Sequence, residues 1–428
     1  MADPLASLLA GTYRDPQTGE LLAAETRSVV IADSLAGDEV ELVTPLVPGR
    51  RLALIADRIT FAVLGERVAE ALAGRFEVER VILDAPHADA ATVERITHGL
   101  DPRTDAVIAV GSGTINDLSK MVALARACPQ LVFATAPSMN GYTSVSASIT
   151  SDGVKRSVRA RTPVGVFFDL RVLAAAPLRL IRAGLGDSAC RSTAQADWLL
   201  AHLVLDRPYR EAPFALLAAD EAALFGQAGA LVSGDLVALR HLVRTLVLSG
   251  VGMTLCGGSF PASQGEHLLG HYLEMRQPAG QPLAFHGEQI GVCTLTMAAL
   301  QERMLAADRA PVVFATAATR EDLVDHWGPG IGEACWLELA GKRLDRDGAE
   351  ALSARLARDW DRIRARIVPV QVGAAALRAV LATAGAMLAP AELGCTEALF
   401  ADALVHAREI RNRYTFLDLA ADARAGPA

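Results

Sequence analysis

The sequence predicts an α/β domain over residues 1–178 followed by an all-α domain over residues 179–428. The first part alternates short apolar runs with helical segments, which is the pattern of a parallel sheet with crossover helices. The second part consists of long Ala- and Leu-rich segments with helical spacing and few strand signals. A chain of 428 residues also exceeds the roughly 250–300 residues at which one core stops growing.

The expected strands are short apolar runs, as strands buried on both faces require. We expect strands at Arg51–Asp57, Val78–Leu83, Ala106–Val110 and Leu131–Ala134, with helices at Val63–Ala73, at Thr92–His98 and directly after the third strand. The β-branched segment Val29–Pro48 adds a hairpin or edge strands. We expect helices in the second domain, which opens near Pro177, at 186–204, 218–255, 262–275, 287–307, 349–365, 374–388 and 396–412.

Composition excludes several classes of protein. A net charge of −8 disfavours non-specific nucleic-acid binding. None of the six cysteines forms a CxxC pair, which predicts reduced, mostly buried thiols. The N-terminus does not resemble a secretory signal, and the uncharged stretch 245–265 is too interrupted by Gly and Pro to span a membrane. We therefore expect a cytoplasmic protein without nucleic-acid or membrane partners.

A glycine-rich turn follows the third expected strand, in AVIAVGSGTINDLSK (106–120). Gly111, Ser112 and Gly113 let backbone N–H groups approach a phosphate at the start of a helix. The turn lacks the full GxGxxG and Walker A patterns, and an ordinary tight turn is the alternative. Asp57 ends the first strand, where an acidic residue commonly contacts an adenosine ribose, and Asp84 competes for this role.

Three further segments carry candidate metal ligands. Asp187 and Arg191 are four residues apart, and the residues around them in the sequence are small and apolar. They could form an ion pair at the surface, or Asp187 could be a buried carboxylate that needs a cation. His267 and His271 are also spaced i,i+4, which is common in metal sites, but Leu268 replaces the Glu of metalloproteases. His286 precedes a helix expected near Glu288. One Asp and two His leave an open coordination position, as a catalytic metal needs.

In this order the segments resemble the iron-containing alcohol dehydrogenase and dehydroquinate synthase-like superfamily, over roughly residues 30–420. The similarity is to the sn-glycerol-1-phosphate dehydrogenase branch. The motifs are GSGTINDLSK, TAPSMNGYTSVSASI, GLGDSACRSTAQADW, GGSFPASQGEHLLGHYLEM, FHGEQIGVCTL and RNRYTFLDLA. The resemblance implies a dehydroquinate synthase-like fold with a Rossmann-like first domain.

The resemblance also assigns site residues. It implies that Asp187, His267 and His286 hold one divalent metal (zinc, nickel or iron), with His271 as a proton relay. Asp57 would favour NAD over NADP. Asp117 and Lys120 would have catalytic roles near the nicotinamide or the substrate. Asn140, Ser144 and Arg191 would contact the substrate. Further contacts with the cofactor would come from Gly111, Ser112, Gly113, Thr114, Asp117, Thr135 and Ser138.

Two positions are informative about the substrate. Arg191 stands where relatives with phosphorylated substrates typically carry Lys, and a cation there suits a phosphate. Asn140 replaces the family's acid in SMDGY, and an amide cannot accept a proton as a carboxylate can. The implied activity is NAD(P)-linked, metal-dependent reduction of dihydroxyacetone phosphate to sn-glycerol 1-phosphate by a homodimer or larger homo-oligomer.

Other functions remain open at this point. A polyol or alcohol dehydrogenase would keep the fold and the metal but use an unphosphorylated substrate. A dehydroquinate synthase-like cyclase is disfavoured because its Gly-Gly-Gly-Val loop is absent. A metal-dependent hydrolase or a catalytically silent binding protein would ignore NADH.

Overall fold

A computed structural model describes residues 3–151, 154–277 and 284–423. The chain forms two compact units. Unit 1 comprises residues 1–188 and 211–259, and unit 2 comprises 189–210 and 260–428. This division differs from the expected boundary after residue 178. The reason is packing: α10 (Ala212–Gly226) lies against α12 (Leu236–Leu255), and α12 lies against α7 (Leu170–Ala174) of the α/β part.

Unit 1 is built on a parallel sheet of six strands in the order β3-β10-β7-β6-β4-β5. The strands are β3 (Ser28–Ala32), β4 (Arg51–Asp57), β5 (Glu77–Leu83), β6 (Ala106–Gly111), β7 (Gln130–Ala134) and β10 (Gly165–Asp169). The four strands expected from apolar runs are therefore confirmed, β4 with the expected ends. The three middle strands β10, β7 and β6 are buried along their whole length, which explains their continuous apolar sequences.

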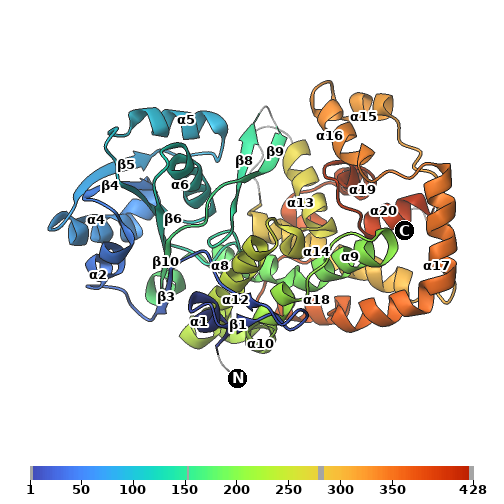
Figure 1. The fold of residues 1–428 in the computed structure, drawn as a ribbon, viewed down its shortest axis with the longest axis horizontal. Coiled ribbons are helices and arrows are strands. Elements are labelled where there is room, and N and C mark those ends of the chain that lie inside the picture. Colours follow the sequence, from blue (N-terminus) through green and yellow to red (C-terminus); the bar gives the residue numbers. More distant parts are fainter. Residues whose placement is uncertain (1–2, 152–153, 278–283, 424–428) are drawn as a thin grey trace. The chain divides into compact units, whose positions relative to one another are not determined.

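Helices cover both faces of this sheet, with α5 (Ala90–Gly99) and α6 (Gly113–Ala125) along one face and α2 (Glu39–Val43) and α4 (Glu66–Ala73) along the other (Figure 1). Alternate residues of the central strands, such as Leu52, Leu54 and Ala56, join the helices α2 and α4 in one core. Unit 1 also contains α1 (Pro4–Leu9), β1 (Tyr13–Arg14), β2 (Leu21–Leu22), η1 (Thr44–Leu46), α3 (Arg58–Thr60), η2 (Phe61–Gly65), β8 (Ser146–Ser151), β9 (Val154–Arg159), α8 (Leu178–Ala189) and α11 (Ala228–Val232).

Three expectations for this unit need correction. The segment Val29–Pro48 forms one edge strand and then a helix, because Ser28–Ala32 pairs in parallel with β10 and not with a following strand. The β8–β9 hairpin and the strand β10 were not expected. Segment 218–255 is not one helix, since it is interrupted at Gln227 and before Leu236.

The strand order places a reversal between β4 and β6. From β4 the chain first adds β5 on one side, and the later strands β6, β7 and β10 follow on the other side, with the earlier strand β3 at the edge beyond β10. In open α/β sheets, ligands bind beyond the carboxyl ends of the strands at such a switch point. Asp57 ends one of these two strands, and the turn at Gly111–Gly113 follows the other.

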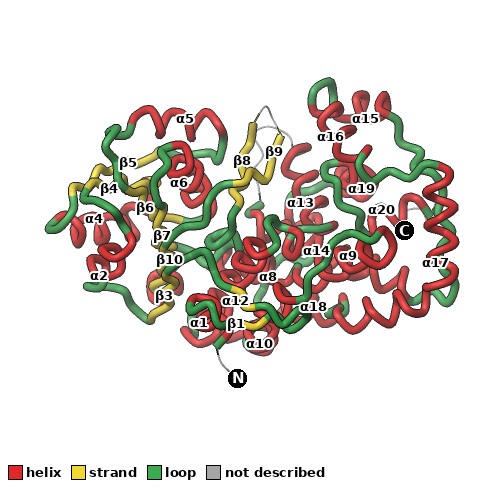
Figure 2. Tube along the Cα trace, viewed as in Figure 1, coloured by secondary structure: helices red, strands yellow, loops and turns green. Residues whose placement is uncertain are grey.

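Within the residues described, unit 2 consists of helices and connecting loops, as Figure 2 shows. Its all-α character confirms the expectation for the C-terminal part of the chain. The elements are α9 (Arg191–Leu205), η3 (Phe260–Ala262), α13 (Gly265–Arg276), α14 (His286–Leu305), α15 (Arg320–Trp327), α16 (Ile331–Ala340), α17 (Arg346–Ile367), η4 (Val368–Val370), α18 (Ala374–Thr383), η5 (Pro390–Leu393), α19 (Glu397–His406), η6 (Ala407–Glu409) and α20 (Phe416–Asp422).

Two stretches are long and apolar enough to cross a membrane by length and composition alone. The first, Leu236–Leu255, is 67% buried inside unit 1, as the core helix of a soluble protein would be. It is the buried helix that the uncharged stretch 245–265 predicts, and it ends in a loop at Cys256. The second, Arg346–Thr383, is 17% buried over its most apolar window. Such helices are weak indicators of a membrane span.

Candidate active site

The glycine-rich turn of unit 1 has the geometry of a phosphate-binding turn. β6 ends at Gly111, Ser112 precedes the helix, and α6 begins at Gly113. A Cβ atom on Gly111 would lie 2.5 Å from the Cβ of Ile115, so a side chain there would displace the first turn of the helix. Thr114 is exposed and Ser112 is half-buried, which leaves the helix N-terminus accessible to an anion.

Asp57 lies on the strand that adjoins β6, whereas Asp84 follows the outer strand β5. One carboxylate oxygen of Asp57 accepts the Thr60 N–H at 2.8 Å, which caps the short helix α3. Asp84 is exposed and pairs with Arg58 at 3.2 Å. Of the two candidates, Asp57 is nearer to the switch point of the sheet.

Lys120 is buried in unit 1, with 1% of its surface exposed. Its Nζ atom donates to the carbonyl oxygens of Gly141 (2.9 Å), Ser144 (2.9 Å) and Ser146 (3.0 Å). Burial lowers its pKa to about 8, against a smaller upward effect from Asp117. Lys120 thus ties α6 to the loop that precedes β8.

That loop contains most of the other expected contacts. Ser144 is buried, and its hydroxyl lies within 3.0 Å of the main-chain carbonyls of Gly141 and Ser146, to either of which it can donate. Thr135 donates its N–H to the carbonyl of Gly111 at 3.1 Å, beside the glycine-rich turn. Ser138 and Asn140 are half-buried in the same loop. The structure thus brings these residues together with Lys120 in one unit.

Asp117 links α6 to the hairpin that follows the loop. Its two carboxylate oxygens accept the Ser148 N–H and the Asn116 side-chain amide, each at 3.0 Å. The side chain remains half-buried. Asp117 therefore holds the start of β8 against the helix that carries the glycine-rich turn.

Asp187 lies near the end of α8 in unit 1 and is 1% exposed. Its Oδ2 atom accepts the backbone N–H of Asn140 at 2.8 Å. Close approach of loop and helix depends on Gly184, where a Cβ would lie 1.7 Å from the Pro137 carbonyl oxygen. The helix expected over 186–204 is wrong in one respect: α8 ends at Ala189 and α9 begins at Arg191, so Asp187 and Arg191 do not share one continuous helix.

The three candidate histidines cluster in unit 2. His267 and His271 lie on α13, and His286 is the first residue of α14. The ring centroids of His267 and His286 are 5.2 Å apart, and His271 lies 6.1 and 5.8 Å from them, respectively. The structure thus confirms helical placement for the HxxxH pair and brings His286 beside it.

A carboxylate lies near Nδ1 of His267 and of His286. Glu266 lies 2.9 Å from Nδ1 of His267, and Glu274 lies 3.6 Å from that of His286. The close contact makes Nε2 the candidate metal ligand of His267 and resembles the carboxylate–histidine arrangement of metal sites, whereas Nδ1 of His286 has no hydrogen-bond partner among the described residues. A carboxylate and two imidazoles form a donor set that suits zinc, nickel or iron. The residues therefore fit a divalent metal.

His271 has a different environment. Its Nδ1 atom lies 3.3 Å from Glu274, and its Nε2 atom lies 3.2 Å from a guanidinium nitrogen of Arg411. Because a guanidinium only donates, Nε2 accepts and Nδ1 carries the proton. Sequence reasoning missed Glu266, Glu274 and Arg411. The acidic residues at i−1 and i+3 from a histidine were the only local signal.

Arg191 opens α9 in unit 2 and is half-buried. Its guanidinium donates to the side-chain oxygen of Gln195 at 2.9 Å. Gln195 in turn donates to the Tyr209 hydroxyl at 2.9 Å. Gln195 lies one turn further along the same helix, so the direction of the Arg191 side chain is fixed by a partner on α9.

Comparisons with known proteins agree with this geometry. Residues 30–177 match the family described as iron-containing alcohol dehydrogenase. A glycerol-1-phosphate dehydrogenase [NAD(P)+] of Halalkalibacterium halodurans is 35% identical over 58% of this chain, which spans 64% of that protein, less than two thirds of its length. For two other enzymes of the same name, the match covers a larger share of the relative. The Pyrococcus furiosus enzyme is 34% identical over 64% of this chain and 78% of its own length. The Geobacillus stearothermophilus enzyme is 30% identical over 86% of this chain and 85% of its own length.

Solved structures share the fold at low identity. A probable glycerol dehydrogenase from Sinorhizobium meliloti superposes with a TM-score of 0.61 at 19% identity, over 94% of this chain and 98% of that one. A sulfoacetaldehyde reductase from Bifidobacterium kashiwanohense in complex with NAD+ gives 0.58 at 14% identity, over 93% and 96%. Fold, glycine-rich turn, histidine cluster and sequence relatives agree: the chain belongs to the glycerol-1-phosphate dehydrogenase branch of the iron-containing alcohol dehydrogenase family.

Proposed function

We propose that this protein uses NAD(P)H and a divalent metal to reduce dihydroxyacetone phosphate to sn-glycerol 1-phosphate. The observation that carries the proposal is the agreement of several relatives, 28–35% identical and all named glycerol-1-phosphate dehydrogenase [NAD(P)+]. The carboxylate hydrogen-bonded to Nδ1 of His267 supplies independent support for metal chemistry.

Asp187, His267 and His286 are the proposed metal ligands. The metal would polarise the ketone oxygen of the substrate, and the nicotinamide would deliver hydride to the adjacent carbon. Within unit 2, Glu266 lies 2.9 Å from Nδ1 of His267 and so limits the rotation of that imidazole. Within unit 1, the Asn140 N–H holds one oxygen of Asp187 and so limits its rotation.

The proposed cofactor site is the switch point of the sheet in unit 1. The N–H groups of Ser112, Gly113 and Thr114 would bind the pyrophosphate at the start of α6. Asp57 would accept hydrogen bonds from the adenosine ribose and repel a 2′-phosphate, which favours NAD. Asp117, Thr135 and Ser138 are proposed to lie along the same cofactor.

His271 is the proposed proton relay to the carbonyl oxygen as hydride arrives at carbon, for which its Nε2 atom would have to take up a proton and give up the hydrogen bond from Arg411. Glu274 holds its Nδ1 atom and thereby orients the ring. Asn140, Ser144 and Arg191 are the proposed substrate contacts, and Asn140 can offer a hydrogen bond but no proton acceptor. Lys120 is proposed to act near the nicotinamide or the substrate by supporting their loop.

The test is NADH oxidation by metal-loaded protein, followed at 340 nm. Dihydroxyacetone phosphate is compared with dihydroxyacetone and glyceraldehyde, and glycerol is tested with NAD+. Turnover confined to the phosphorylated ketone supports the proposal, and chiral analysis of the product checks its handedness. Turnover only of unphosphorylated substrates would make the protein a polyol dehydrogenase, and no turnover with any of them would refute dehydrogenase activity.

We also propose a cytoplasmic homo-oligomer, a dimer or larger, that acts on a small phosphorylated molecule without nucleic-acid or membrane partners. The acidic net charge of −8 and the naming of the relatives as metabolic dehydrogenases support this proposal. Light scattering on the purified protein measures the oligomeric state. A monomer at micromolar concentration would contradict the oligomer proposal.

A further inference from the structure

A buried carboxylate of unit 2 joins three helices to α9 beside the histidine cluster. Asp197 lies on α9 and is fully buried. Its Oδ2 atom accepts the Gly265 N–H at 2.9 Å, and its Oδ1 atom accepts the Phe416 N–H at 2.9 Å and the Gln301 side-chain amide at 3.1 Å. Gly265 begins α13, Phe416 begins α20 and Gln301 lies on α14. One side chain thus holds the first residues of two helices.

The contact with α13 depends on close packing. A Cβ atom on Gly265 would lie 2.8 Å from Oδ2 of Asp197, so glycine lets the helix begin at this distance from the carboxylate. The next residue is Glu266, whose Oε1 atom accepts the Gln264 N–H at 2.7 Å and lies 2.9 Å from Nδ1 of His267. Asp197 therefore fixes the backbone immediately before the Glu266–His267 pair.

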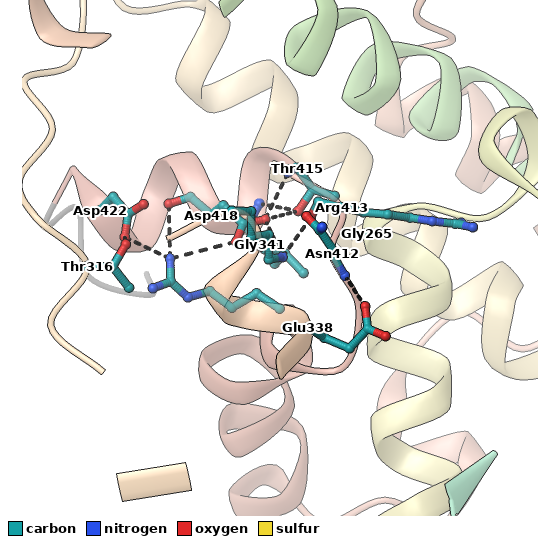
Figure 3. A network of polar contacts seen from close by, with 12 residues as sticks. Gly265, Thr316, Glu338, Gly341, Asn412, Arg413, Thr415, Asp418 and Asp422 are labelled. Carbon is teal, nitrogen blue, oxygen red and sulfur yellow. Dashed lines mark hydrogen bonds and ion pairs between the residues drawn. The ribbon is translucent and has the colours of Figure 1, made fainter. Parts of the chain in front are cut away.

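The carboxylate of Asp197 is also held from its other side. Thr415 and Asp418 cap the start of α20 reciprocally, with the Thr415 N–H donating to Asp418 at 2.8 Å. Figure 3 shows this capped start of α20, with Gly265 of α13 in the same view. The Gln301 amide donates to a main-chain carbonyl of α9 at 3.0 Å as well as to Asp197. The Asp197 side chain cannot rotate without losing N–H partners on both sides.

Keeping a carboxyl group at this place is costly. Burial, and then the negative charge of Glu266, raise the pKa of Asp197 to about 8. In the described part of unit 2 no ion pair neutralises Asp197, whereas the buried acid Asp422 pairs with Arg408 at 2.9 Å. The three partners of Asp197 are all N–H donors, which only acceptor oxygens can satisfy. The costly group is therefore explained by the backbone that it holds in place.

We propose that Asp197 is a positioning residue of the metal centre, which sets where α13 begins and thereby directs Glu266 and the His267 ring. Glu266 accepts the proton of His267 at Nδ1, so Nε2 is left to face the metal. The inference rests on the proposed function in one respect, since it takes His267 as a metal ligand. Substituting a group that orients a ligating histidine typically weakens metal binding by about 10- to 100-fold.

Asp197→Asn is the principal test, because it keeps the shape of the side chain and turns one acceptor oxygen into an amide donor. That donor then faces either the Gly265 N–H or the two donors on the other side, and the start of α13 has to move. Asp422→Asn is the matched control. Asp422 is a buried acid of the same unit, and its hydrogen-bond partners lie outside α13.

Metal affinity is measured by competition for Zn²⁺ between the metal-free protein and a chelating dye. We expect the dissociation constant for zinc to rise about 10- to 100-fold in Asp197→Asn and to stay within about twofold of wild type in Asp422→Asn. With Co²⁺ in place of zinc, the visible absorption bands report the ligand geometry and should shift only in Asp197→Asn. Thermal unfolding of all three proteins measures the loss of stability, which we expect for both substitutions.

These measurements separate the inference from the proposed activity, because none of them depends on turnover. Weaker zinc binding and a shifted Co²⁺ spectrum in Asp197→Asn alone support the positioning role even if dihydroxyacetone phosphate is not reduced. Unchanged zinc affinity and an unchanged spectrum, with only a lower unfolding midpoint, would assign Asp197 to stability alone. That result, or an equal loss of affinity in Asp422→Asn, overturns the inference even if the enzyme reduces dihydroxyacetone phosphate.

A second variant keeps the inference testable if Asp197→Asn does not fold. Gln301→Met retains most of the side-chain length but removes the amide that donates to Oδ1 of Asp197. The carboxylate then keeps its two main-chain partners, so zinc affinity should fall about threefold, less than in Asp197→Asn. Zinc affinity and a Co²⁺ spectrum identical to those of wild type in Gln301→Met would contradict the positioning role.

Discussion

Replacing Lys120 by methionine tests whether this residue stabilises the loop before β8. Methionine keeps most of the length and the apolar stem but removes the ammonium group. Three main-chain carbonyls, those of Gly141, Ser144 and Ser146, then lose a donor within 3.0 Å. The same loop carries Asn140, whose N–H binds Asp187.

The magnitude follows from two opposing terms. Each hydrogen bond from the charged ammonium group contributes about 1.5–3 kcal/mol, so losing three costs roughly 6 kcal/mol. Removing the buried charge returns about 3 kcal/mol, because the pKa of Lys120 falls from 10.5 to about 8 and each unit corresponds to about 1.4 kcal/mol. We expect a net loss of about 3 kcal/mol near neutral pH.

The assay is thermal and urea unfolding, combined with hydrogen exchange over residues 139–146. Arg58→Met is the matched control, because Arg58 is 74% exposed and its ion pair with Asp84 contributes little. Faster exchange confined to the loop, with a lower midpoint, is the expected result. Unchanged stability and exchange together with a large fall in kcat would refute the reasoning and place Lys120 at the reacting atoms.

Three further predictions concern the same elements. The folded-state pKa of Lys120 lies below its unfolded value, so protonation of Lys120 favours the unfolded state. The stability that the neutral amine provides is therefore full above pH 10.5 and is lost as pH falls to about 8. The difference between the unfolding free energies of wild type and Lys120→Met should change by about 2 kcal/mol between pH 8 and 9.5. Gly184→Ala places a Cβ against the Pro137 carbonyl and should cost about 1–3 kcal/mol or more in thermal unfolding, whereas Gly226→Ala, with open space around it, should cost nothing. Asp187→Ala, His267→Ala and His286→Ala should each lose stoichiometric metal by elemental analysis, and His202→Ala should retain it; retention by the first three contradicts the ligand assignment.

The sequence predicted those parts of the fold that depend on burial alone. β4 and its neighbour β6 are buried on both faces over most or all of their length, and their apolar runs marked them directly. β10 is equally buried but was not expected: its apolar run passes directly into the helix α7 at Leu170, so periodicity could not separate the strand from a buried helix segment. The interruption at Cys190 between α8 and α9 carries no Gly or Pro, so nothing in the local sequence marked it.

The boundary between the units could not be predicted for a related reason. The segment from α10 to α12 has the composition of the helical half, yet it packs with the α/β part through contacts such as the Thr143 hydroxyl on the Val247 carbonyl, at 2.7 Å. Gly250 permits this approach, because a Cβ there would lie 2.3 Å from the Thr143 hydroxyl oxygen. Composition predicts the type of an element but not its packing partner.

The surroundings of the histidines divide in the same way. Glu274 stands three residues from His271 on the same helix, so this contact follows from helix geometry and could have been predicted. Glu266 is adjacent to His267 in the sequence, but adjacent residues do not face each other on a helix, so only the structure shows their contact. Arg411 reaches His271 from 140 residues away, and only the tertiary turn at Asn412 brings it there. Contacts from within α13 thus orient His267 and His271. The Arg411 contact with His271 is supplied by a distant segment, so a substitution at Arg411 changes the surroundings of His271 while the Glu266–His267 contact within α13 persists.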